Sequence, residues 1–152
     1  MREEKATEEE MKRLRIILLL FSLTLAVNSQ TTLSVIFQPT DLGFGVRVDQ
    51  QVKDIGFYAS GSKGEYRFDN GYIKDHYKIT LGGIGYMYNN SFLTVGINHH
   101  IYGKHEGELP KGTLDKYSLE IGAGARIKRV AVFFAFDPIK GEGNVGIGFV
   151  IR

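Results

Sequence analysis

The chain has 152 residues, of which 19 are basic and 17 acidic, so its formal net charge at pH 7 is +2. This length corresponds to one domain, and the near balance of charge disfavours a nucleic-acid partner, which would require basic residues clustered on one element. The absence of cysteine excludes disulfides, thiolate metal sites, cysteine nucleophiles and an acylated cysteine.

The stretch MKRLRIILLLFSLTLAVNSQ, residues 11–30, has the layout of a secretory signal. A basic start precedes an apolar run over residues 16–27, which is shorter than the ~20 residues that span a bilayer. Val27 and Ser29 are small enough to precede a cleavage site before Gln30. The acidic residues 1–10 do not suit the front of a signal, so we expect Met11 to be the true start. The alternative to a signal peptide is that the apolar run forms a short buried helix. The predicted division is an upstream extension plus signal peptide over 1–29 and a barrel domain over 30–152.

From Gln30 onward apolar residues recur with period two, and no helical period appears. The pattern predicts eight strands, at residues 32–38, 42–48, 54–60, 76–88, 92–102, 116–127, 130–136 and 143–152. Short turns are expected at 49–53, 89–91 and 128–129, and longer connections at 61–75, 103–115 and 137–142. The phase of the fourth strand is ambiguous at Gly82 and Gly83, which predicts a β-bulge there.

Each predicted strand places large apolar residues on one face and glycine or isolated polar residues on the other. Glycine weakens strands, so it is a poor choice for a face that meets water. It suits the crowded lumen of a narrow barrel, because eight strands leave an interior only wide enough for side chains. We therefore predict an all-β fold, an eight-stranded antiparallel up-and-down transmembrane β-barrel whose apolar face meets lipid. A soluble exported, lipocalin-like ligand-binding barrel with its apolar face inside is the alternative.

This orientation assigns two sets of residues. The predicted lumen set is polar and consists of Arg47, Lys78, Asn98, His100, Glu120 and Arg126. Glycines opposite them would make room for charged groups to pair, for example Glu120 with Arg126 or Arg47. The predicted lipid-interface set is aromatic and consists of Phe37, Tyr77, Tyr117 and Phe136.

The strand count, the alternation and the asymmetry of the connections over residues 31–152 resemble the small eight-stranded outer-membrane barrels of the OmpA-transmembrane-domain and OmpX-like class. The resemblance implies a bacterial outer-membrane location, contact with lipid and lipopolysaccharide, and insertion by the barrel-assembly machinery. Terminal strands of the class commonly end in an aromatic residue, whereas Phe149 stands three residues before Arg152 here.

Some barrels of this class modify lipid A, so the resemblance also admits a catalytic function. The candidate residues are His99 and His100, because a histidine beside a serine or aspartate can activate a hydroxyl. At similar height along the strands stand Asp75, His76, His105, Asp115 and Ser118. His99 and His100 point to opposite faces of a strand and cannot readily chelate one metal together. No metal or cofactor is predicted, and no catalytic residue is assigned.

Three functions remain open from the residues. The first is a non-enzymatic barrel with a closed polar lumen, acting in envelope integrity or surface interaction. The others are a lipid A-modifying enzyme and the soluble ligand-binding barrel. Lys104, Glu106, Glu108 and Lys111, in the predicted connection 103–115, are candidates to contact lipopolysaccharide phosphates or bridging cations. The surface partner is not identified.

Overall fold

The computed structural model describes residues 30–151, so the predicted signal peptide and the predicted start at Met11 lie outside the described residues. The strands are β1 (Gln30–Gln38), β2 (Gly43–Val52), β3 (Ile55–Phe68), β4 (Gly71–Tyr86), β5 (Ser91–Ile101), β6 (His105–Gly107), β7 (Tyr117–Ile127), β8 (Val130–Asp137) and β9 (Glu142–Ile151). A single 3₁₀ turn, η1 (Tyr88–Asn90), joins β4 to β5. Among the described residues, no helix is long and apolar enough to cross a membrane.

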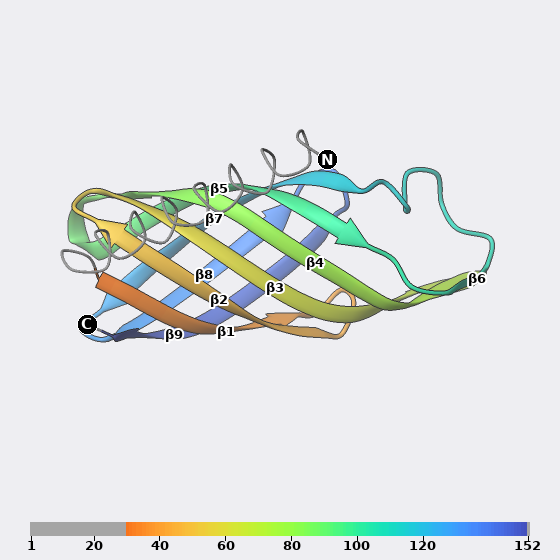
Figure 1. The fold of residues 1–152 in the computed structure, drawn as a ribbon, viewed down its shortest axis with the longest axis horizontal. Helices are drawn as coiled ribbons and strands as arrows, with labels where there is room; N and C mark the ends of the chain where they lie inside the picture. Colours follow the sequence, from red (N-terminus) through yellow and green to blue (C-terminus); the bar gives the residue numbers. More distant parts are fainter. Residues whose placement is uncertain (1–29, 152) are drawn as a thin grey trace, which may run out of the picture.

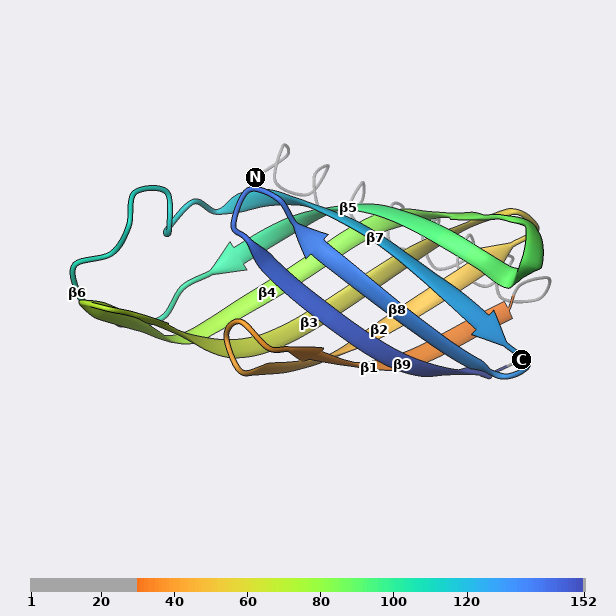
Figure 2. The ribbon, with the colours of Figure 1, turned by 180° about the vertical axis from the view of Figure 1, so that it is seen from behind.

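Eight of these strands close into an antiparallel barrel in the order β1-β2-β3-β4-β5-β7-β8-β9. The closing seam pairs β1 with β9, from Thr31 opposite Ile151 to Phe37 opposite Val145, and the two strands run side by side in Figure 2. Closure matters because an open strand edge in lipid would leave backbone N–H and C=O groups without partners. The predicted fold class is confirmed.

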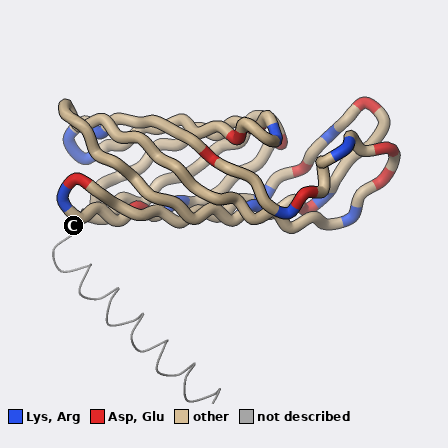
Figure 3. Tube along the Cα trace, turned by 90° about the horizontal axis from the view of Figure 1, so that it is seen from above, with Lys and Arg blue, Asp and Glu red and all other residues tan. Residues whose placement is uncertain are grey.

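The alternation predicted from sequence governs which side chains face outward. Leu33, Val95, Ile121 and Phe149 are each about half exposed on the outer wall, as are most large apolar residues of the strands. The inward positions carry the buried polar residues. Charged residues gather mainly at the two ends of the barrel and in the part that projects from it, whereas the wall carries few (Figure 3). The soluble alternative is therefore wrong, because its apolar face would have to point inward.

The two ends of the barrel differ. One end, called the short-turn end below, carries the tight connections at 53–54, 87–90 and 128–129. The other, called the hairpin end, carries β6 and the β3–β4 hairpin, which extends beyond the other strands in Figure 1. This hairpin corrects the predicted loop at 61–75, because β3 continues to Phe68, β4 begins at Gly71, and β6 pairs with residues 71–73. The sequence does not predict these strand extensions, because strands that continue beyond the bilayer do not need an apolar outer face. The alternation of apolar and polar residues, by which strands are predicted, is therefore absent there.

The predicted bulge at Gly82 and Gly83 is also wrong. These residues pair in regular register with Tyr58 and Phe57. The irregularity lies farther up β4, where Lys74 and Asp75 together oppose one residue of β3 and Asp75 has a φ of 53°. In the part of β4 near the short-turn end, apolar residues occupy inward as well as outward positions, because the lumen at this height holds an apolar cluster. The cluster consists of Ile36, Tyr58, Ile84, Phe92 and Phe133, with Tyr86 packed against it.

Candidate functional site

The hairpin end of the lumen holds a set of buried polar side chains, which we call the polar cluster. Its members are Asp41, His76, Asn98, His100, Ser118, Asp137 and Glu142, and none is more than 4% exposed. They come from the β1–β2 turn and from β4, β5, β7, β8 and β9. Strands far apart in the sequence thus contribute to one site, which only the closed barrel assembles.

A relay of contacts runs through the polar cluster. His76 Nδ1 lies 3.4 Å from Asp41 Oδ2, and His76 Nε2 lies 2.9 Å from His100 Nδ1. On the other side of the ring, His100 Nε2 lies 2.6 Å from Ser118 Oγ, and Ser118 in turn donates to Asp137. The two imidazole rings are stacked at an interplanar angle of 9°. Two carboxylates are therefore joined across the lumen by two histidines and a hydroxyl.

Proton counting shows what this relay lacks. It has four contacts, namely Asp41 with His76, His76 with His100, His100 with Ser118, and Ser118 with Asp137. Two neutral imidazoles and one hydroxyl supply three protons, because each of these groups carries one. With both carboxylates ionised, one contact is left without a proton.

Asp137 is held more firmly than the other acidic groups of the polar cluster. Its Oδ1 accepts from the backbone N–H groups of Ile139 and Lys140, each at 2.9 Å, in the turn that follows β8. Its Oδ2 accepts from Asn98 Nδ2 at 3.0 Å, and Asn98 Oδ1 accepts from Thr80 Oγ1 at 2.6 Å. Lys140 closes over this end by donating to Tyr102 Oη at 2.8 Å, and partial burial lowers the pKa of Lys140.

Below the polar cluster, Lys78 lies between two glutamates. Its Nζ is 3.7 Å from Glu120 Oε2 and 3.8 Å from Glu142 Oε2. Glu120 is further satisfied by Tyr58 Oη at 3.0 Å and Asn144 Nδ2 at 2.8 Å. The partner of Glu120 is thus Lys78, rather than Arg126 or Arg47 as considered from the sequence.

Arg47 lies in the middle of the lumen, 1% exposed, and donates to Asp49 at 2.5 Å. Its guanidinium carbon lies 3.9 Å from the ring centroid of Tyr58 and 4.3 Å from that of Phe133. This stacking between two aromatic faces partly replaces hydration, since both terminal nitrogens lack a hydrogen-bond partner. Charge, stacking and packing together fill the middle of the barrel.

Arg126 occupies the short-turn end of the lumen. It donates to Gln30 at 2.9 Å, to Thr32 at 3.1 Å and to Gln51, and it lies over the ring of Tyr86. Arg126 therefore ties β7 to β1 and β2 across the interior.

Glycines face the largest lumen side chains. A Cβ added at Gly146 would lie 2.1 Å from the ring of Phe133, and one at Gly124 would lie 2.3 Å from that of Phe92. Tyr58 lies against Gly82 and Gly96 in the same way. The glycine-rich faces thus make room mainly for aromatic rings, and less for the charged pairs that the sequence suggested.

The structure separates the two histidines considered for catalysis. His100 points into the lumen, whereas His99 points outward and stacks on Tyr117 with ring centroids 5.0 Å apart. His76 and Ser118 join His100, but Asp75, His105 and Asp115 are exposed outside the polar cluster. The structure places Arg47, Lys78, Asn98, His100 and Glu120 in the buried interior and Arg126 half-buried at its end. The aromatic side chains of Phe37, Tyr77, Tyr117 and Phe136 are exposed on the outer wall.

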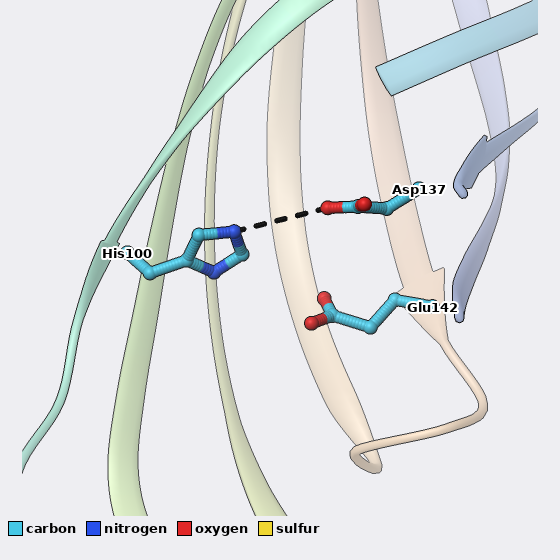
Figure 4. Close-up of side chains that lie close together, drawn as sticks. All are labelled: His100, Asp137 and Glu142. Carbon is cyan, nitrogen blue, oxygen red and sulfur yellow. Dashed lines mark ion pairs between the residues drawn. The ribbon is translucent and has the colours of Figure 1, made fainter. Parts of the chain in front are cut away.

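Three acidic members of the polar cluster were not among the residues selected from sequence. Asp137 and Glu142 continue the inward phase of β8 and β9 (Ala131, Phe133, Ala135, Asp137 and Glu142, Asn144), so following that phase to the strand ends would have found them. Asp41 lies in a turn, where alternation carries no information. Figure 4 shows Asp137 and Glu142 pointing from β8 and β9 toward His100 on β5.

Solved structures provide the comparison. The backbone structure of the Yersinia pestis outer membrane protein Ail in a phospholipid bilayer nanodisc is similar to this chain with a TM-score of 0.54 and 15% identity, over 81% of this chain and 99% of Ail. A crystal structure of Ail, the attachment invasion locus protein of Yersinia pestis, in complex with the heparin analogue sucrose octasulfate, has a TM-score of 0.45 and 12% identity, over 82% and 99% of the two chains. No protein-family model and no curated protein sequence matches the chain.

The chain has the fold of a small outer-membrane β-barrel. Its outer wall is apolar and its lumen polar, an arrangement that is stable only when lipid surrounds the wall. Closed barrels of this kind, with strands exposed to lipid, are the β-architecture of the bacterial outer membrane. Fold and surface together identify an outer-membrane β-barrel protein.

Proposed function

We propose that the protein is a non-enzymatic outer-membrane barrel with a closed lumen, which acts through the part that projects beyond the bilayer. The observation that carries the proposal is the filling of the lumen. Arg47, Phe133 and Tyr58 fill the middle of the barrel, and the polar cluster fills the hairpin end, with all of these side chains buried. A continuous water path for solutes is not compatible with this filling.

The projecting hairpin offers the surface for interaction. Beyond the barrel rim, β3, β4 and β6 form a small sheet whose side chains mix charges with aromatic rings. A groove of about 640 Å³ crosses it, lined in part by Arg67, Phe68, Tyr72 and Glu106. A paired sheet presents such side chains in a more rigid arrangement than a loop would, which lowers the entropic cost of binding.

Lipopolysaccharide is the proposed partner nearest the membrane. Lys74 and Lys104 lie on neighbouring segments, joined by a backbone hydrogen bond of 2.9 Å. Lys63 lies near the ring of Tyr77, one of the proposed lipid-interface aromatics, and its 2.6 Å contact with Asp75 lowers the pKa of that carboxyl group. Ammonium groups at this height would contact phosphates of the outer leaflet. Insertion by the barrel-assembly machinery belongs to the same proposal.

Two measurements test the proposal. Protein refolded into planar bilayers is expected to conduct no ions, and a steady conductance would refute the closed lumen. For lipopolysaccharide, the thermal unfolding midpoint is compared in bilayers with and without it. The wild type should be stabilised by lipopolysaccharide, and the double substitution K74Q and K104Q should reduce that shift. K53Q, at the short-turn end, is the matched control. Equal shifts in all three proteins would exclude this contact.

A lipid A-modifying enzyme is the second candidate, because Ser118 Oγ lies 2.6 Å from His100 Nε2 and a second histidine links the latter to Asp41. This order of groups resembles a hydroxyl nucleophile beside a histidine, although the hydroxyl of Ser118 donates to Asp137 in this arrangement. The serine is, however, buried in the lumen, where a lipid has no access. Mass spectrometry of lipid A from cells with and without the protein decides between the two functions. A modification that disappears in S118A and persists in H99Q would establish the enzyme.

A further inference from the structure

We propose that His100, Asp137 and Glu142 form a binding site for one divalent transition-metal ion of the Zn²⁺ type inside the hairpin end of the barrel. The ligand atoms of these three residues lie within 4.8 Å of one another, and all three side chains are buried. They come from β5, β8 and β9, so the ion would link strands that are not neighbours in the sequence. Figure 4 shows the three side chains converging.

Zn²⁺ is typically bound by imidazole nitrogen and carboxylate oxygen at ~2.0–2.2 Å. For donor atoms at most 4.8 Å apart, an inward movement of less than about 1 Å each reaches these distances. The backbone of Glu142 begins β9 directly after a turn and lies opposite Asp137 in the β8–β9 pair. Asp137 is positioned in advance by the two backbone N–H groups that hold its Oδ1. Its Oδ2 lies 3.8 Å from His100 Nε2 and would exchange its hydrogen bonds from Asn98 and Ser118 for the ion.

Glu142 supplies an independent observation. Its Oε2 is buried and makes no hydrogen bond of regular geometry among the described residues. The polar groups near this carboxylate are the hydroxyl of Tyr66 and Lys78 Nζ, the latter 3.8 Å away. A buried carboxylate oxygen without a partner is costly. In Figure 4 this carboxylate points toward the same space as the His100 ring and the Asp137 carboxylate. A metal ion in that space would give this oxygen a closer partner than Lys78.

The charge around the site also favours a cation. The hairpin half of the lumen holds four buried carboxylates, those of Asp41, Glu120, Asp137 and Glu142, whereas Lys78 is the one buried lysine among residues 30–151. Arg47 does not contribute to this balance, because it is paired with Asp49. Buried charges require compensation. A divalent ion would supply two of the missing positive charges at the point where two carboxylates meet.

The surroundings of His100 are those of a metal-ligating histidine. Its second ring nitrogen, Nδ1, contacts His76 Nε2 at 2.9 Å, and His76 continues to Asp41. Such outer contacts orient the ring and raise the basicity of the coordinating nitrogen. An imidazole ligand favours Zn²⁺ and its neighbours over Mg²⁺ and Ca²⁺, which prefer oxygen ligands alone.

The test uses the untagged chain, refolded in detergent with Zn²⁺ present, because the three ligands are buried. After passage through metal-free buffer, zinc per chain is measured by mass spectrometry, and Co²⁺ is used in parallel for its absorption bands. H100Q and E142Q each remove one ligand with little change in shape. H99Q is the matched control, since it removes the adjacent histidine on the outer face. A heat-dependent shift on an SDS gel confirms that each variant is folded.

The wild type and H99Q are expected to retain one zinc per chain, whereas H100Q and E142Q should bind at least about tenfold more weakly. Mg²⁺ in excess should not displace the zinc. The proposal is overturned if the folded wild type retains no zinc and shows no Co²⁺ bands. It is equally overturned if H100Q and E142Q retain as much zinc as H99Q, which would place the bound ion elsewhere. If one of these two variants does not fold, the other still locates the ion, and the absence of Co²⁺ bands from the wild type overturns the proposal in either case.

Discussion

Replacing Gly146 with alanine tests the idea that glycine makes room for aromatic rings in the lumen. The added Cβ would lie 2.1 Å from Cζ of Phe133, closer than unbonded carbon atoms approach. The ring cannot simply turn away, because it is 6% exposed and lies against the guanidinium of Arg47. Overpacking of this kind costs about 1–3 kcal/mol of folding free energy.

Gly143 is the matched control on the same strand. It faces outward, and an added Cβ would meet Phe134 at 3.5 Å, which is an ordinary contact. Alanine at such a position stabilises by about 0.4–1 kcal/mol, because the unfolded chain loses freedom. The free energies of unfolding of G146A and G143A are therefore expected to differ by roughly 1.5–4 kcal/mol.

The measurement is urea unfolding of the refolded barrel, followed by far-ultraviolet circular dichroism because the chain has no tryptophan. A double-mutant cycle isolates the contact. F133L shortens the ring side chain, so the combination with G146A should lose less stability than the sum of the single changes, with a coupling of about 0.5–3 kcal/mol. Equal stabilities of G146A and G143A, or strict additivity with F133L, would refute the reasoning.

Three further predictions concern the charge in the lumen, the outer wall and the leader. R47M should destabilise the barrel by about 3–5 kcal/mol because it leaves Asp49 buried without its cation, and adding D49N should recover much of the loss in the same unfolding assay. V95K introduces a charge on the lipid-facing wall and should cost about 2–4 kcal/mol, whereas Y88K, in the exposed turn η1, should cost less than about 1 kcal/mol; similar losses would argue against a lipid-facing wall. Mass spectrometry of the mature protein from an outer-membrane fraction should find Gln30 at its N-terminus, and a retained leader would contradict the predicted cleavage.

The sequence was sufficient to predict the class of fold. Alternation in a barrel is a local property, because successive side chains of any strand point to opposite faces. The run from Tyr117 to Ile127, with apolar residues on one face and Ser118, Glu120 and glycine on the other, shows this without reference to any neighbour. The same reasoning predicts His100 on the inner face and His99 on the outer face. In the structure His100 is buried and His99 is half-buried.

What the sequence did not show depends on register between strands. The bulge at Asp75 arises from the pairing of β4 with β3, and the β3–β4 hairpin extends where the apolar alternation has already ended. The partners of the charged groups are likewise decided across the lumen, where Lys78 lies beside Glu120.

The polar cluster is the clearest case. Asp41, His76 and Asp137 are distant in the chain and lie in segments that sequence reasoning treated as a turn, a strand start and a loop. They share one site only because the barrel closes at the β1–β9 seam and sets the height of each strand relative to the next. The two-residue period can be recognised in the sequence of each strand alone. The stagger between neighbouring strands, which brings residues of different strands to the same height, is a property of the closed barrel.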